Sequence, residues 1–197
     1  MAATHQQLCP RDCPLETGGL SAEDAAKANR PVPLPAGSGL DAVRLPIEDG
    51  SDQEFMDQWA RSGLWGTPLY FADALQRWPN LIGEAVATIC TAPPMVLMHC
   101  GRGHDRTGIT TVVILHLVGA TIDGIVDDYL LSAQNLMAED PAAAIFLNEA
   151  LAGAGVTAHG AISAAIDVMD DDWRRRAGLT DATVAALQRR LVGADTG

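Results

Sequence analysis

Two apolar runs near the middle of the chain enclose a polar stretch. The first, MVLMHC at residues 95–100, is short and almost continuously apolar, which favours a strand buried in a parallel sheet. The second lies within residues 106–120, RTGITTVVILHLVGA. It is rich in β-branched residues, but its length and its apolar character on all sides favour a buried helix. The polar stretch therefore joins a predicted strand to a predicted helix.

Another strand is predicted further upstream, at residues 41–47, DAVRLPI, which lead into the acidic turn EDGSD. The residues between the two strands, 54–92, carry helical patterns, with Thr67 as a cap and Pro68 at a first helical position. They predict a helical crossover. Because such a unit places the carboxyl ends of both strands at one edge of the sheet, Asp49 and Cys100 are expected to share a crevice.

The C-terminal half is predicted to be helical. Apolar positions recur at helical spacing in four segments, the last of them capped by Thr180: residues 122–134, 142–155, 161–178 and 180–192. The expected fold class is α/β, with a short parallel sheet flanked by helices and a helical C-terminal half.

The N-terminal segment, residues 1–39, differs from the rest of the chain. It holds a short helix candidate at residues 21–30, with Ser21 as its cap, and a connector rich in Pro and Gly at residues 30–39. A chain of 197 residues is long enough to bury one good core. Residues 40–193 are therefore expected to form one domain, preceded by a divergent segment.

Composition and charge limit the classes of partner that we expect for the protein. A net charge of −12 argues against nucleic acid, which needs a basic face on its protein partner. The sequence shows neither the roughly 20 continuous apolar residues of a membrane span nor a secretory signal, so we expect a cytoplasmic protein. The four cysteines match neither a disulfide framework nor a zinc ribbon. We expect reduced thiols, an incidental C-x3-C pair at Cys9 and Cys13, and no metal or cofactor.

The polar stretch, HCGRGHDRTG at residues 99–108, combines a cysteine with the features of an anion site. Between Cys100 and Arg106, backbone N–H groups can turn inward around an anion, assisted by the positive end of the helix dipole. The guanidinium of Arg106 can donate to two phosphate oxygens. The same features lower the pKa of Cys100, so a thiolate can attack phosphorus and form a phosphocysteine. The stretch lacks the Lys of a Walker A loop.

The pattern H-C-x5-R-T-G resembles the signature of the protein-tyrosine phosphatase superfamily, and the fuller stretch resembles the HCxxGKDRTG loop of bacterial atypical tyrosine phosphatases. The resemblance extends over roughly residues 40–192, where LPIED is similar to the family's general-acid segment. Two departures stand out. Residues 1–40 contain neither the family's Asn-Phe-Arg-Asp-Leu-Gly-Gly-like segment nor its early strand, and the loop Lys is replaced by His104, whose charge titrates near neutrality.

The resemblance implies a role for each residue of the loop. Cys100 is expected to be the nucleophile, Thr107 to hydrogen-bond its sulfur, and His99 to orient the loop from below. The phosphoryl group is expected to be held by Arg106 and by the loop residues before it, namely Gly101, Arg102, Gly103, His104 and Asp105. The side chain of Arg102 contacts either substrate or solvent.

Two carboxylates are candidates for the general acid. Asp49 closes LPIED and is the expected acid, with Asp105, directly before the loop arginine, as the second candidate. Glu48, Asp52 and Asp57 are expected to form a solvated acidic face.

Other side chains near the predicted site have two interpretations each. Cys90 is expected to be a small core residue, with a regulatory disulfide to Cys100 as the alternative. A set of aromatic side chains is expected in the core, with a specificity wall in a mobile helical lid as the alternative: Trp59, Trp65, Tyr70 and Phe71.

The predicted function is a cysteine-dependent phosphomonoester hydrolase, a protein-tyrosine or dual-specificity phosphatase acting on a phosphorylated protein or small phosphomonoester. A phosphoinositide or small-metabolite phosphatase uses the same chemistry and stays open, as does a phosphate-binding pseudophosphatase. A rhodanese-type sulfurtransferase is disfavoured by the five residues between Cys100 and Arg106 and by the presence of Asp49 as an acid partner of Cys100.

Overall fold

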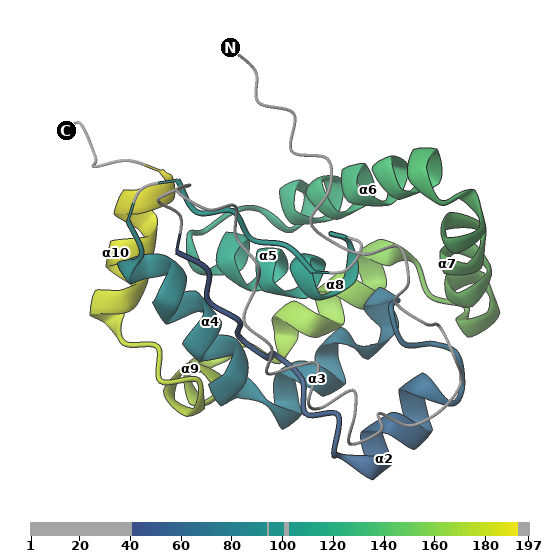
Figure 1. Ribbon diagram of the computed structural model, residues 1–197, viewed down its shortest axis with the longest axis horizontal. Coiled ribbons are helices and arrows are strands. Elements are labelled where there is room, and N and C mark those ends of the chain that lie inside the picture. The colour runs from purple at the N-terminus through teal and green to yellow at the C-terminus, as the bar shows by residue number, and fades with distance from the viewer. Residues whose placement is uncertain (1–40, 94, 101–102, 193–197) are drawn as a thin grey trace.

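The computed structural model describes residues 41–93, 95–100 and 103–192. The helix candidate at residues 21–30 and the predicted domain boundary at residue 39 lie outside these ranges. The regular elements of the described part are helical and are, in chain order, α2 (Gln53–Phe55), the π-helical turn η1 (Met56–Ala60), the 3-10 turn η2 (Pro68–Tyr70), α3 (Phe71–Arg77), α4 (Pro79–Thr91), α5 (Asp105–Leu117), α6 (Ile122–Glu139), α7 (Pro141–Ala154), α8 (Ala158–Asp167), α9 (Asp171–Arg176) and α10 (Asp181–Leu191) (Figure 1).

The predicted parallel sheet is wrong for the described residues. Neither residues 41–47 nor residues 95–100 form a strand, and Figure 1 shows both as irregular traces. The side chains expected to be buried face solvent, with Met95 99% and Leu97 78% exposed. Met95 also has a φ of 70°, in the left-handed region, which an extended strand excludes. A short apolar run does not by itself specify a strand, so the shared sheet edge expected for Asp49 and Cys100 does not exist here.

Helix α5 confirms the buried helix predicted after the polar stretch. It packs against α4, α6, α8 and α10 and occupies the middle of the molecule (Figure 1). Ile109, Val112 and Val113 are almost completely buried, and burial of such side chains contributes about 1.5–3 kcal/mol each. The start of α5 is therefore held in place from several sides.

The C-terminal helices agree with the sequence pattern apart from one break. Residues 161–178 were expected to be one helical segment, but α8 ends at Asp167 and α9 starts at Asp171. Asp170 causes the restart, because its side chain accepts from the N–H of Trp173 at 2.7 Å and caps α9. Thr180 caps α10 in the same way, as predicted.

The expected helix start at Pro68 is confirmed, but the cap differs. Thr67 is the residue before η2 and Pro68 is its first residue. The hydroxyl of Thr67 donates to the carbonyl oxygen of Leu64 at 2.7 Å and makes no cap hydrogen bond. The Thr67 side chain therefore stabilises the preceding loop and not the N-terminus of η2.

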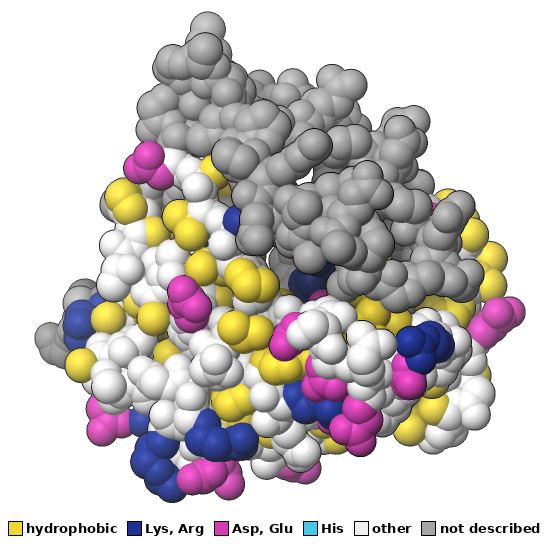
Figure 2. Space-filling view, turned by 60° about the horizontal axis from the view of Figure 1, so that its bottom comes forward, with side chains coloured by type: hydrophobic (Ala, Val, Ile, Leu, Met, Phe, Trp, Pro, Cys, Tyr) yellow, Lys and Arg dark blue, Asp and Glu magenta, His cyan; other side chains and the backbone are white. Residues whose placement is uncertain are grey.

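Charges of both signs are interspersed on the molecular surface. On the face drawn in Figure 2, Arg side chains lie next to Asp and Glu side chains. One such cluster is centred on Arg77, which pairs with Asp52, Glu54 and Asp73.

In the part of the chain that the structure describes, no single helix meets the length and apolarity needed to cross a membrane, although the bent pair α7 and α8 meets them together.

Candidate active site

The start of α5 presents the charged residues of the loop. Asp105 and Arg106 are its first two residues, and the hydroxyl of Thr110 donates to the carbonyl oxygen of Arg106 at 2.9 Å. Gly103 has a φ of 71°, which suits glycine in the turn that enters the helix. N–H groups in the first turn of a helix have no intrahelical acceptor and favour an anion. The N-terminal end of α5 is therefore suited to hold an anion.

Cys100 and Arg106 interact electrostatically. Cys100 is half-buried and forms no disulfide bond among the described residues. Burial lowers the pKa of Arg106, but the negative charges of Glu48, Cys100 and Asp105 raise it more, so the guanidinium stays charged. Gly101 and Arg102, both expected to surround the phosphoryl group, lie outside the described residues.

The imidazole of His104 is directed at α6. Its ring is 3% exposed, with Nδ1 2.9 Å from the hydroxyl of Ser132 and Nε2 3.1 Å from the hydroxyl of Tyr129, both on α6. The sequence interpretation had this side chain facing the phosphoryl group as a titrating substitute for lysine. In the structure, its two hydrogen bonds instead connect the start of α5 to α6.

The expected general acid, Asp49, lies at the surface. Its Oδ1 accepts from the backbone N–H of Ser51 at 2.9 Å and from the hydroxyl of Ser51 at 2.6 Å. These bonds stabilise the acidic turn locally. The structure records no contact of this carboxylate with Cys100 or Arg106 among the described residues, so a catalytic role for Asp49 stays a prediction.

Glu48 takes a position that the sequence analysis did not assign to it. Its side chain is only 9% exposed, and its Oε2 lies 3.9 Å from Nε of Arg106. Its Oε1 lies 2.7 Å from the hydroxyl of Tyr70 and accepts from Nε1 of Trp65 at 3.3 Å. Burial raises the pKa of Glu48, an effect that the two hydrogen bonds and Arg106 reduce. The expectation of a solvated carboxylate is therefore wrong for Glu48.

Asp105, the second candidate acid, belongs to the same group. Its Oδ1 also accepts a hydrogen bond from the hydroxyl of Tyr70, at 2.7 Å. Tyr70 thus links the first residue of α5 to the carboxylate that pairs with Arg106. Sequence spacing gave no signal for this contact, because 35 residues separate Tyr70 from Asp105.

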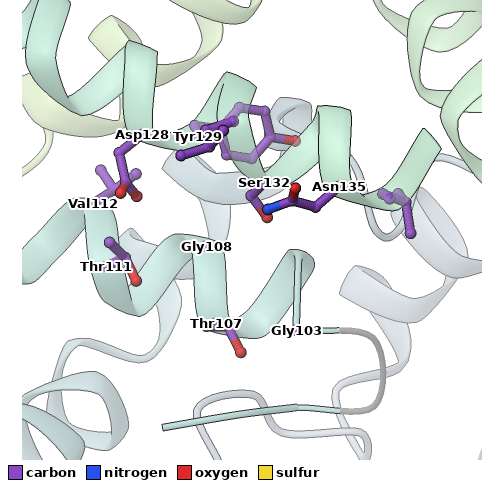
Figure 3. Close-up of a pocket in the computed structure, with 11 residues that line it drawn as sticks. Gly103, Thr107, Gly108, Thr111, Val112, Asp128, Tyr129, Ser132 and Asn135 are labelled. Atoms are coloured by element: carbon purple, nitrogen blue, oxygen red, sulfur yellow. The ribbon is translucent and has the colours of Figure 1, made fainter. Parts of the chain in front are cut away.

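Thr107 and His99 are two further residues of the motif. Among the described residues, the buried Oγ1 of Thr107 has no hydrogen-bond partner, which leaves it able to donate to a sulfur or to a ligand. The residue lines a cavity of about 280 Å³ between α5 and α6, together with Gly103, Ser132 and Asn135 (Figure 3). His99 is exposed, with Nδ1 3.2 Å from the carbonyl oxygen of Cys100.

The remaining candidates, four aromatic residues and Cys90, lie in the hydrophobic core or pack against it. Tyr70 and Phe71 are fully buried, in agreement with the core interpretation, whereas Trp59 and Trp65 are partly buried at its edge. Cys90 packs against the core with its Sγ 3.7 Å from the carbonyl oxygen of Thr183, and it carries a free thiol whose pKa burial raises. The described ranges contain no group of three or more His, Cys, Asp or Glu side chains placed to hold a metal ion.

Comparison with known proteins agrees with this arrangement. Over 94 residues the chain is 35% identical to the triple specificity protein phosphatase PtpB of Mycobacterium tuberculosis. The matched region covers 45% of this chain and 34% of that protein. The chain thus spans about a third of the length of this curated relative. No solved structure matches the chain significantly. Residues 22–193 match the tyrosine phosphatase family, a region that starts inside the segment predicted to be divergent. The chain belongs to the tyrosine phosphatase family.

Proposed function

We propose that the protein hydrolyses phosphomonoesters through a phosphocysteine intermediate on Cys100 and acts as a protein-tyrosine or dual-specificity phosphatase. The observation that carries this proposal is the position of Arg106 in the first turn of α5, near enough to Cys100 for the charge of a thiolate there to raise the pKa of Arg106. A positive guanidinium and a helix N-terminus favour both the thiolate and the phosphate dianion.

The proposed reaction has two steps. The Cys100 thiolate attacks phosphorus, so that a sulfur–phosphorus bond forms and the bond to the leaving oxygen breaks. Arg106 and the N–H groups at the start of α5 stabilise the charge on the phosphoryl oxygens. A protonated carboxyl donates to the leaving oxygen, and water then attacks phosphorus and releases the thiolate. We assign the carboxyl to Asp105, which adjoins Arg106, in preference to Asp49, which is bonded to Ser51.

The substrate is proposed to be a phosphorylated protein. The relative in Mycobacterium tuberculosis is described as a protein phosphatase of triple specificity, which supports a broad panel of substrates. Phosphoinositides and small phosphomonoesters belong in that panel. A cytoplasmic location and independence of metal ions and nucleic acids stay predictions.

The test compares the wild type with Cys100→Ser on peptides carrying phosphotyrosine, phosphoserine or phosphothreonine and on phosphoinositides. We expect turnover of the phosphotyrosine peptide by the wild type and a loss of several orders of magnitude in Cys100→Ser, about the cost of removing a nucleophile. Phosphate should still bind to the variant. If the folded wild type binds phosphate but turns over none of these substrates, the protein is a pseudophosphatase.

A further inference from the structure

One hydroxyl group lies between two carboxyl groups. The Tyr70 hydroxyl is 2.7 Å from Oε1 of Glu48 and 2.7 Å from Oδ1 of Asp105. A phenol carries a single proton, so it donates to only one of these oxygens. The second short contact is favourable only if that carboxyl carries a proton and donates it to the phenol oxygen. The geometry therefore calls for two protons within the group of Glu48, Tyr70 and Asp105: the phenol proton and one on a carboxyl group.

The position of this hydroxyl is fixed by packing. Tyr70 is fully buried, and its ring makes edge-to-face contacts with Phe55 and Phe71 at centroid distances of 5.8 and 5.3 Å. Such contacts add about 0.5–1.5 kcal/mol per pair. Solvent is largely excluded around Glu48 as well. In a medium of low polarity, two adjacent carboxyl groups do not readily ionise together.

The charges around the group favour a proton on Glu48. Burial raises the pKa of Glu48, and hydrogen bonds from Tyr70 and Trp65 and the charge of Arg106 lower it only in part. Burial and both carboxylates raise the pKa of Tyr70, so the phenol keeps its proton.

We propose that Glu48 and Tyr70 are positioning residues that orient Asp105. They also supply the proton that Asp105 gives to the leaving group, a role that rests on the proposed function. The Glu48 proton moves to the Tyr70 oxygen as the Tyr70 proton moves to Asp105. Asp105 gives the proton that it has received to the leaving oxygen as the bond between this oxygen and phosphorus breaks. When water attacks the phosphocysteine and the sulfur–phosphorus bond breaks, a water proton returns along the same path. The protons balance over one turnover, with water as the second substrate.

The test uses two variants that remove different parts of the path. Tyr70→Phe deletes only the hydroxyl, and Glu48→Gln keeps a hydrogen-bonding group but has no ionisable proton. Each variant is measured on an alkyl phosphate, whose leaving group needs a proton, and on nitrophenyl phosphate, whose leaving group departs as a stable anion. We expect kcat on the alkyl phosphate to fall by about 10- to 100-fold, with nitrophenyl phosphate changed only a few-fold. The double variant should lose no more than either single variant.

Tyr129→Phe is the matched control, because it removes another buried hydroxyl, bonded to His104 rather than to a carboxyl group. Any loss it causes should be equal on the two substrates. Infrared spectroscopy of the resting enzyme near neutral pH supplies a readout besides activity. The wild type should show the carbonyl band of a protonated carboxylic acid, and Glu48→Gln should lack it.

Three results would overturn the relay: wild-type kinetics in both variants, equal losses on both substrates, or an infrared spectrum that Glu48→Gln leaves unchanged. Each of these results, found together with an inactive Cys100→Ser, removes the relay and leaves the proposed function standing. An active Cys100→Ser would instead remove the proposed function itself.

Discussion

Arg106 is the residue on which phosphate binding depends most. Its guanidinium can donate two parallel hydrogen bonds to phosphoryl oxygens, whereas a lysine offers one point charge. We expect Arg106→Lys to lower kcat/KM by roughly 100-fold or more, at the scale of a lost transition-state contact. Steady-state kinetics check this, with Arg61→Lys as the control because Arg61 pairs with Asp57 at the surface. Near-normal kinetics in Arg106→Lys would exclude Arg106 from the site.

The two acid candidates make opposite predictions. Asp105→Asn should lower turnover of poor leaving groups by about two orders of magnitude and spare activated aryl phosphates. Asp49→Asn should behave like the wild type on both, because its carboxylate is bonded to Ser51. The pH–rate profile supplies a second check, since only Asp105→Asn should lose its basic limb. If Asp49→Asn shows the selective loss, Asp49 is the acid despite its exposed position.

A local motif predicts which residues belong to one site, but it does not predict their surroundings. Cys100 and Arg106 were assigned as a site because both belong to one local motif with fixed spacing. His104 and Glu48 were misplaced because their environments come from distant residues: Tyr129 for one and Tyr70 for the other. No local pattern states whether a side chain beside a loop turns inward or outward.

At the scale of elements, the contact between α4 and α9 depends on a glycine. A Cβ atom at Gly83 would overlap the backbone carbonyl oxygen of Ala177, which cannot move without shifting α9. Gly83→Ala should therefore destabilise the protein by about 1–3 kcal/mol, the usual cost of overpacking. Urea unfolding checks this. Gly153→Ala on α7 is the control, because a Cβ there meets nothing, and it should stabilise by up to about 1 kcal/mol. Equal stabilities of the two variants would contradict this account.

The helices were predictable and the strands were not. Helical spacing and capping residues are local, so α4, α6, α7 and α10 appear where the sequence places them. A strand needs a partner from elsewhere in the chain, and the apolar run at residues 95–100 has none in the described residues. A single sequence holds no local signal for that missing partner.

At the scale of the whole molecule, the buried carboxyl group of Glu48 lowers the stability of the folded protein as pH rises. The pKa of Glu48 is raised above its ordinary value of 4.5 mainly by burial. The neutral form is therefore favoured in the folded state, and stability is lost as pH rises from the unfolded pKa through the folded pKa. Glu48→Gln stays neutral, so its Tm should exceed that of the wild type increasingly over this range. Thermal melts across pH test this, and a gap that narrows with rising pH would contradict it.

The most direct test of the account is the detection of phosphate on Cys100 during turnover. The enzyme is mixed with nitrophenyl phosphate, quenched rapidly, digested and examined by mass spectrometry. We expect the mass of one phosphoryl group on the peptide that contains Cys100, and no such adduct in Cys100→Ser, which should also be inactive. Turnover that continues in Cys100→Ser, or a wild type that turns over substrate with the phosphoryl group on a different residue, would contradict covalent catalysis by Cys100.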